Sequence, residues 1–239
     1  MCFNRKLMAI PERSHSPRNS IFELTTNKAM IKRIYFARHG ETDCNKQNLI
    51  QGKGIDAPLN QLGHRQAQAF YDHYHHIPFD RVYTTSLQRT RQSMAPLIAS
   101  GVPHETNPGF DEMNFGIMEG QPMFDEQGQF ALEWLLTQWR NGDGDAKVEK
   151  GESPNEVMDR IAKALDQVIA RTDETNVVVC MHGRAIRVLL CYLLGEPISQ
   201  MEHHPHNNLG VSLFEYSYDT EKYTPIFLAS YEHLEKLSM

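Results

Sequence analysis

Two apolar stretches of this chain each end in a histidine followed by a glycine. Residues 34–40 read Ile-Tyr-Phe-Ala-Arg-His-Gly, and residues 177–183 read Val-Val-Val-Cys-Met-His-Gly. A continuous apolar run of this length is typical of a strand buried on both faces of a parallel sheet. Because ligands bind beyond the carboxyl ends of such strands, we expect both histidines at the same edge of one sheet.

Strand-like and helix-like patterns alternate from Met30 onward. The helix signal that begins at Ser153 is the clearest, because Pro154 and Glu156 complete a capping box with proline at the first position. The expected strands cover 31–37, 79–84, 177–181, 211–218 and 223–229. The expected helices cover 62–76, 129–140, the segment after Ser153 and a leucine-rich segment up to Gly195. A further helix is expected from Ser86, and Pro96 should kink it. This alternation predicts an α/β protein, a three-layer α/β/α sandwich with a mainly parallel central sheet.

The domain organisation follows from changes in composition. Residues 1–29 are rich in Arg, Ser and Pro without a helical period, and we expect a disordered extension there, with a transit peptide as the alternative. Residues 30–239 read as a single domain, in which 117–150 form a helical cap or insertion.

Composition excludes several classes of function. The net charge is −6 with no long basic run, so a nucleic-acid partner is not expected. No apolar segment reaches the roughly 20 residues that cross a membrane. The four cysteines show no CxxC spacing, which favours a reducing compartment, and we expect a cytoplasmic protein. The sequence gives no indication of oligomeric state.

Two arginines indicate that the histidines face an anion. Arg38 directly precedes His39, and Arg89 lies where a helix follows another expected strand. Helix N-termini favour anions, and a guanidinium adds a bidentate fork for phosphate or carboxylate. A lone histidine at a strand end is more often structural, but two of them with nearby arginines favour a phosphate or carboxylate site.

With these residues in place, the chain resembles the histidine phosphatase superfamily, also called the phosphoglycerate-mutase-like family, over residues 31–231. The tripeptide Arg-His-Gly alone would be a weak match, whereas the ordered series of motifs is specific. That series is Arg38-His39-Gly40-Glu41-Thr42 with Asn45, then Gln51-Gly52, Asp56, Pro58-Leu59-Asn60 and Gly63, then Ser86-Leu87-Gln88-Arg89-Thr90, Asp111 to Gly116 with Glu119-Gly120, Gly151-Glu152-Ser153, and His182-Gly183.

The resemblance implies a covalent mechanism. His39 would attack phosphorus as a neutral imidazole and become a phosphohistidine, while Arg38, Arg89 and His182 neutralise the transferred phosphoryl group. Glu112 would protonate the leaving oxygen and later deprotonate water, so it must hold a proton near neutral pH. Asp111 and Glu119 are alternatives for that role.

The remaining residues of the implied site bind the substrate. Asn45 would donate a further hydrogen bond, Gln51 and Gly52 would line the adjoining substrate pocket, and Gly183 would let the backbone approach the phosphate. The resemblance implies no metal and no cofactor, because arginines and histidines supply the positive charge.

The expected activity is hydrolysis of small-molecule phosphomonoesters, that is, a phosphatase. A cofactor-dependent phosphoglycerate mutase is the alternative, but between Met113 and Ala146 the only cation is Arg140, against six carboxylates. Such a stretch suits a leaving group with little charge. A catalytically silent module that binds phosphorylated ligands is a third reading, disfavoured because neither the nucleophile nor an arginine is missing.

Two histidine clusters raise a metal hypothesis. His73, His75 and His76 end an expected helix, and His203, His204 and His206 lie in a later loop. Their spacing matches no common zinc signature. We expect solvated side chains in the first cluster and a segment bordering the active site in the second.

Overall fold

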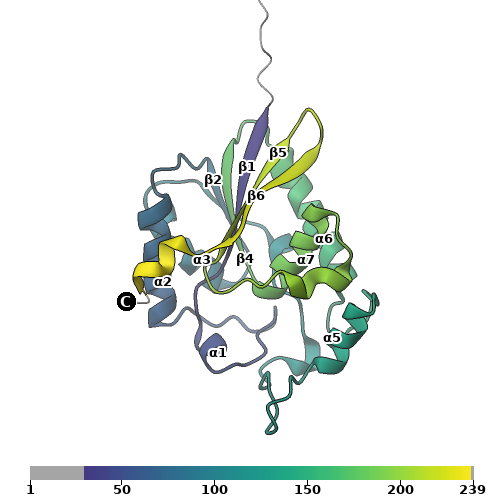
Figure 1. Cartoon of the computed structure of the whole chain (residues 1–239). Helices are drawn as coiled ribbons and strands as arrows, with labels where there is room; N and C mark the ends of the chain where they lie inside the picture. Colours follow the sequence, from purple (N-terminus) through teal and green to yellow (C-terminus); the bar gives the residue numbers. More distant parts are fainter. Residues whose placement is uncertain (1–29, 238–239) are drawn as a thin grey trace, which may run out of the picture.

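One six-stranded sheet organises the protein. The computed structural model describes residues 30–237, so the expected extension over 1–29 lies outside the described residues. The sheet order is β3-β2-β4-β1-β5-β6 (Figure 1). The strands are β1 (Ile31–Arg38), β2 (Arg81–Thr84), β3 (His104–Thr106), β4 (Asn176–Met181), β5 (Val211–Ser217) and β6 (Lys222–Ser230). Strands β1 to β4 pair in parallel, whereas β5 and β6 are antiparallel additions at one side.

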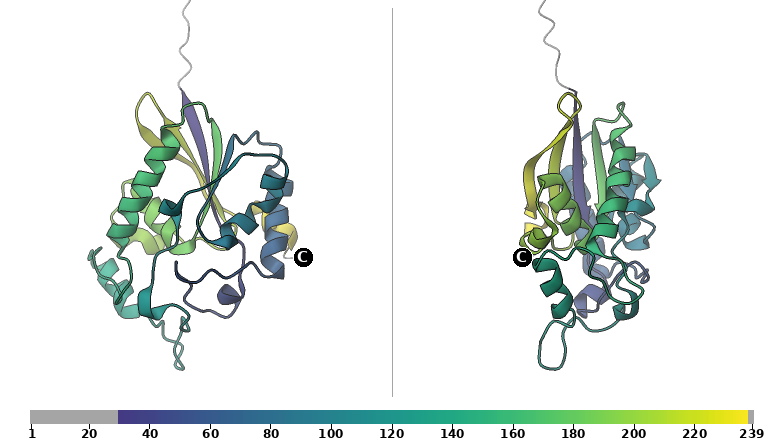
Figure 2. Two further views of the ribbon diagram at one scale, coloured as in Figure 1. Left: turned by 180° about the vertical axis from the view of Figure 1, so that it is seen from behind. Right: turned by 90° about the vertical axis from the view of Figure 1, so that its right-hand side faces the viewer.

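Helices cover both faces of this sheet (Figures 1 and 2). The α-helices are α1 (Asp43–Lys46), α2 (Gln61–Tyr74), α3 (Gln88–Ser93), α4 (Ala95–Ala99), α5 (Glu133–Arg140), α6 (Pro154–Ile169) and α7 (Gly183–Leu194). Short 3-10 helices are η1 (Pro108–Phe110), η2 (Gly116–Met118), η3 (Ile198–His203) and η4 (Glu232–Leu237). The expected α/β fold with a mostly parallel sheet is confirmed.

Alternating side chains of the central strands divide the core in two. On β4, Val177, Val179 and Met181 pack with residues of α6 and α7, whereas Val178 and Cys180 pack with residues of α2 and α4. All five are fully buried. The apolar run is continuous because both faces of the strand are covered.

Local sequence signals explain where the helices begin and end. Ser153 and Glu156 form the expected capping box at the start of α6. Gly195 ends α7 with a left-handed φ of 68°. Pro96 lies in the first turn of α4, so the single helix expected from Ser86 is divided into α3 and α4.

Two expectations need correction. The edge strand β3 was not predicted, since three residues that pair only with β2 leave no periodic pattern. The helix expected over 129–140 begins at Glu133, because Phe130 instead forms a bridge with Phe124. Within residues 117–150 α5 is the single α-helix, and turns and loops make up most of the rest.

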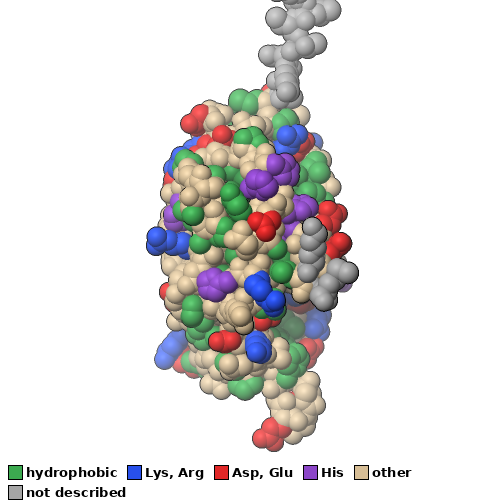
Figure 3. Space-filling model, turned by 90° about the vertical axis from the view of Figure 1, so that its left-hand side faces the viewer, with side chains coloured by type: hydrophobic (Ala, Val, Ile, Leu, Met, Phe, Trp, Pro, Cys, Tyr) green, Lys and Arg blue, Asp and Glu red, His purple; other side chains and the backbone are tan. Residues whose placement is uncertain are grey.

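The surface fits the composition. The face that carries α2 and the C-terminal segment shows scattered acidic, basic and histidine side chains (Figure 3). His73, His75 and His76 are exposed there, as expected. Within residues 30–237 no helix combines the length and apolarity needed to cross a membrane.

A buried histidine near the C-terminal end of the described chain packs against α2. The ring of His233 lies edge-on to Phe70 at 5.9 Å and is 6% exposed. Neither ring nitrogen has a hydrogen-bond partner. Burial, reinforced by His73, lowers the pKa of His233 to about 4.

His233 therefore makes folding stability depend on pH. The unfolded chain binds a proton at this histidine below about pH 6.5, whereas the native protein does not until about pH 4. Stability contributed by this site is present above pH 6.5 and is lost as the pH falls toward 4. We expect His233→Leu to reduce the slope of unfolding free energy against pH in this window by up to about 1.4 kcal/mol per pH unit. Urea unfolding at several pH values measures this slope, and an unchanged slope would contradict the assignment.

Candidate active site

Parallel pairing of β1 with β4 brings the two histidines together. Arg38 is in register with Met181, and the backbone N–H of His39 donates to the Met181 carbonyl oxygen at 2.9 Å. The rings of His39 and His182 are consequently 5.2 Å apart between centroids. The sequence expectation that both histidines share one sheet edge is matched by this geometry.

The hydrogen bond of His39 fixes which ring nitrogen can react. Its Nδ1–H donates to the Gly40 carbonyl oxygen at 2.7 Å, which leaves the lone pair on Nε2. Burial, with Arg89 and Arg38 nearby, holds the pKa of His39 well below its ordinary value. A neutral imidazole with a free Nε2 is the form of histidine that can attack an electrophile.

Hydrogen bonds at both ring nitrogens also fix the tautomer of His182. Arg89 Nε donates to His182 Nδ1 at 3.2 Å, so the ring proton lies on Nε2 and points to the Thr85 hydroxyl at 2.9 Å. Burial and Arg89 hold the pKa of His182 well below its ordinary value. Arg89 itself is fully buried and also donates to the carbonyl oxygens of Ile55 and Gly52.

Arg38 combines one fixed end with one unpaired donor. One terminal nitrogen donates to the His206 carbonyl oxygen at 2.6 Å, while its buried Nε has no partner. Burial lowers the pKa of Arg38 to about 10, so the guanidinium keeps its charge at neutral pH. A Cβ on Gly183 would lie 3.1 Å from Cζ of Arg38. A side chain at this position would therefore require the guanidinium to shift by a few tenths of an ångström.

Two amide side chains, those of Gln51 and Asn45, line the same cleft as His39 and Arg38. Gln51 accepts a hydrogen bond from Thr42 through Oε1, and its buried Nε2 has no partner. Asn45 accepts through Oδ1 from the side chain of Asn208 and from the backbone N–H of Thr42. Asn208 also donates to the His39 carbonyl oxygen at 3.0 Å, so the loop after η3 holds the backbone of His39.

Glu112 lies at the N-terminus of α7. Its carboxylate accepts from the backbone N–H groups of Arg184 and Ala185 at 3.1 and 2.9 Å, and from that of Met113 at 2.8 Å. A helix N-terminus stabilises negative charge. The side chain is 5% exposed and lines the same cleft as His39.

The other two candidate acids have different surroundings. Asp111 accepts from the Ser86 backbone N–H and pairs with Lys53 at 3.5 Å. Glu119 accepts from the Phe115 backbone N–H and fills the space that a Cβ on Gly52 would need. Neither carboxylate lines the cleft, and Gly52 contributes through packing and its carbonyl oxygen rather than through the cleft surface.

Arg160 and Thr85 are positioning residues that had no sequence signal, whereas Asn208 belongs to the loop that was expected to border the site. Arg160 of α6 donates to the carbonyl oxygens of Gly109, Asp111 and Glu112 and pairs with Glu152, which fixes the loop that carries Glu112. Thr85 and Asn208 contact His182 and His39 as described above. Their roles depend on contacts between distant segments, which a single sequence does not display.

The cleft above these groups has a volume of about 530 Å³. The residues of the sequence-predicted site that line it are Arg38, His39, Asn45, Gln51, Glu112 and Gly183, whereas Arg89 and His182 lie fully buried beneath them. His206 of the second histidine cluster also lines the cleft, so that loop borders the site as expected.

A separate group of metal-type side chains has an explanation without an ion. Among the described residues, Cys191, Glu196 and His204 bring one ligand atom each within 4.8 Å of one another. His204 already pairs with Glu196 at 2.6 Å, and burial raises the pKa of the Cys191 thiol to about 12. A neutral thiol is a poor metal ligand, and the other two side chains already satisfy each other through this hydrogen bond.

The close contact between Gly183 and Arg38 predicts the effect of one methyl group. Gly183→Ala should displace the guanidinium and weaken binding of inorganic phosphate or vanadate roughly 10- to 100-fold. The matched variant Ala185→Gly removes a methyl group two positions further along α7. Isothermal titration with vanadate compares them, and thermal unfolding confirms that each is folded. Equal affinity of Gly183→Ala and the unaltered protein would show that Arg38 does not contact the anion.

Comparison with known proteins places this geometry in a family. Residues 34–226 match the family model of the histidine phosphatase superfamily (branch 1). The protein named "Probable phosphoglycerate mutase GpmB" of Yersinia pestis is 31% identical over 189 residues, which cover 77% of this chain and 84% of that protein.

Solved structures with the same fold include two phosphatases. The α-ribazole phosphatase of Shigella flexneri has a TM-score of 0.69 at 24% identity and covers 83% of this chain and 96% of its own. The phosphoserine phosphatase of Entamoeba histolytica, solved with 3-phosphoglyceric acid, has a TM-score of 0.73 at 24% identity, with coverage of 85% and 99%. The chain belongs to branch 1 of the histidine phosphatase superfamily.

Proposed function

We propose that this protein hydrolyses small phosphomonoesters through a phosphohistidine on His39. The observation that supports this most strongly is the free Nε2 of His39 beside two unpaired donors, Arg38 Nε and Gln51 Nε2. A phosphoryl group placed against Nε2 would supply the acceptor oxygens that both donors lack. Buried polar groups without partners are rare, which makes an anionic ligand the natural complement.

The first step transfers the phosphoryl group to the enzyme. The lone pair of His39 Nε2 forms the N–P bond, the ester P–O bond breaks, and the leaving oxygen takes a proton from Glu112. Arg38 and Arg89 offset the charge of the phosphoryl oxygens. Glu112 is suited to this role because its carboxyl group lines the same cleft as His39.

The second step releases phosphate. Glu112 takes a proton from water, the water oxygen bonds to phosphorus, and the N–P bond breaks to restore neutral His39. His182 keeps Arg89 in place through its Nδ1 acceptor, and Thr85 orients the ring. Water is the only reactant that this step adds to the phosphoenzyme.

The charge of the outer cleft supports a phosphatase over a mutase. A phosphoglycerate mutase has to hold a bisphosphate, whereas Arg184 and Arg187 at the rim are both bound by Glu202. Glu133 adds a carboxylate there, itself paired with Arg140. Mutase activity is kept as the second candidate because the relative from Yersinia pestis carries that name. A cytoplasmic location remains part of the proposal, in keeping with three free cysteines among the described residues.

The test of the covalent step follows phosphate release and the phosphoenzyme together. His39→Ala should abolish phosphate release from p-nitrophenyl phosphate. In the unaltered protein, alkaline quenching followed by mass spectrometry should find one phosphoryl group on the peptide that contains His39. The matched control is His75→Ala, which alters an exposed histidine directly after α2. Turnover by His39→Ala at the unaltered rate would contradict the proposal. Interconversion of 3- and 2-phosphoglycerate with a bisphosphate primer, with little phosphate released, would make the mutase reading correct.

The role of Glu112 predicts a dependence on the leaving group. Glu112→Gln should lower kcat/KM for an alkyl phosphate, whose alkoxide needs a proton, by roughly 10²- to 10⁴-fold. For p-nitrophenyl phosphate, whose phenolate leaves without one, the loss in kcat/KM should be much smaller. Asp111→Asn and Glu119→Gln serve as controls, and the same selective loss in either would reassign the acid.

A further inference from the structure

The outer part of the cleft has a lining that phosphoryl transfer does not use. Beyond the donors around His39, half of the lining residues are apolar, and most of these come from one segment between η2 and α5. They are Ile50, Phe115, Met123, Phe124, Phe130, Leu132 and Leu136. An apolar pocket beside a few convergent polar groups is the usual form of a small-molecule site.

Backbone hydrogen bonds attach this apolar wall to the floor of the site. The N–H of Gly120 donates to the Ile50 carbonyl oxygen at 2.9 Å, and the N–H of Met123 donates to that of Asn48 at 2.7 Å. Ile50 in turn donates to Gln121 at 2.8 Å. Asn45 and Gln51 flank residues 48–50, to which this wall is bonded. The wall therefore begins immediately beside the side chains that are proposed to donate hydrogen bonds to the phosphoryl group.

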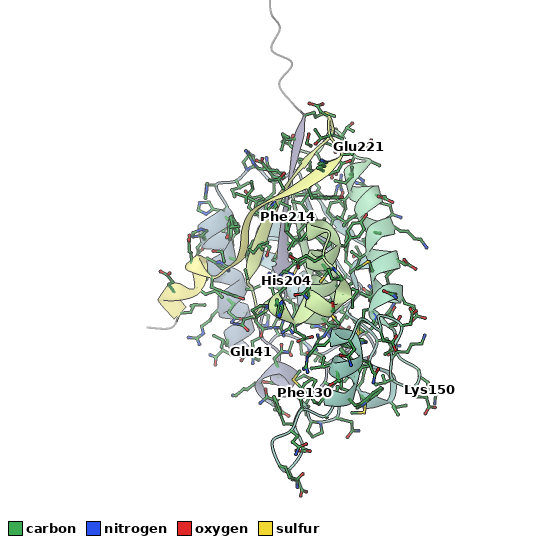
Figure 4. The ribbon with its side chains drawn as sticks, turned by 45° about the vertical axis from the view of Figure 1, so that its right-hand side comes forward. Glu41, Phe130, Lys150, His204, Phe214 and Glu221 are labelled. Atoms are coloured by element: carbon green, nitrogen blue, oxygen red, sulfur yellow. The ribbon has the colours of Figure 1, made fainter. Side chains whose placement is uncertain are left out.

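Two phenylalanines form the upper part of the wall. Phe124 and Phe130 bridge across a turn in which Asp125 accepts from the backbone N–H groups of Gln127 and Gln129. Their rings meet edge to face, 5.8 Å between centroids. Phe124 is 47% exposed although it lines the cleft. Figure 4 labels Phe130 in the lower part of the molecule. Aromatic surface left open to water inside a cleft is surface that a ligand can cover.

The charged groups in this outer part are already paired. Arg187 and Arg184 share the carboxylate of Glu202, and the guanidinium of Arg184 also lies 5.3 Å from the centre of the Trp139 ring. A second strong anion on the substrate would have to compete with Glu202 for these arginines. The outer cleft is therefore suited to an uncharged body rather than to a carboxylate or a second phosphate.

We propose that the substrate is a phosphomonoester whose alcohol part is an uncharged apolar body, of aryl or extended alkyl type, that packs against Phe124 and Phe130. This inference rests on the proposed function and adds the substrate class. The phosphoryl group is held by the donors around His39, and the apolar body extends from its ester oxygen along the wall toward Leu136.

A homologous series of n-alkyl phosphates tests the substrate class. From ethyl to hexyl phosphate the leaving alcohols have similar basicity, so differences in kcat/KM report binding of the alkyl chain. Each methylene that enters the wall should raise kcat/KM about fourfold until the cleft is filled. Glycerol 3-phosphate and 3-phosphoglycerate, of similar length but polar, should fall at least tenfold below butyl phosphate.

Variants locate the binding surface within the cleft. Phe124→Ala and Phe130→Ala should each flatten the increase in kcat/KM per methylene. Trp134→Ala is the matched control, because this exposed aromatic residue of α5 lies outside the cleft lining, and it should leave the increase unchanged.

The outcomes separate this inference from the proposed function. Hydrolysis that rises with chain length and loses this rise in both phenylalanine variants supports the inference. Hydrolysis without such a rise, or a rise that both variants retain, overturns the apolar substrate class and leaves the phosphatase assignment standing. Absence of hydrolysis for every ester, p-nitrophenyl phosphate included, overturns both.

Discussion

The candidate site depends on the parallel pairing of β1 with β4. This pairing puts Arg38, the last residue of β1, beside Met181, the last residue of β4. A histidine follows each strand directly, so both rings lie at one end of the sheet. A shift of one residue in register would move one of these rings to the opposite face of the sheet. The fully buried side chains on both faces of β4 hold the register, because each would lose its packing in a slipped arrangement.

Burial gives the site its electrostatic character. Arg89 and His182 are completely enclosed, and both histidines are neutral although two guanidinium groups lie next to them. The cost of enclosing these charges is offset by backbone carbonyl acceptors, namely those of His206, Ile55 and Gly52. The result is a positively charged pocket whose two histidines are not themselves protonated.

The sequence predicted the parts of this site that follow from strand patterns and ordered motifs. The buried strands, the paired His-Gly ends and Arg89 at the start of a helix all carried local signals. Arg160 and Thr85 did not, because each acts on a segment far away in the chain. The surroundings that distinguish Glu112 from Asp111 and Glu119 likewise depend on the start of α7, on Lys53 and on the Gly52 loop. The late start of α5 reflects tertiary pairing of Phe130 that overrides its helical pattern.

The backbone ladder between residues 48–50 and 120–123 separates two parts of the molecule that could otherwise constrain each other. On one side of it lie the histidines held by the sheet, and on the other lies the turn over residues 124–130, whose ends meet in the bridge between Phe124 and Phe130. Insertions or deletions in the turn would reshape the wall without altering strand register. In evolutionary terms, the ladder would let the outer wall of the cleft change while the residues around His39 stay in place.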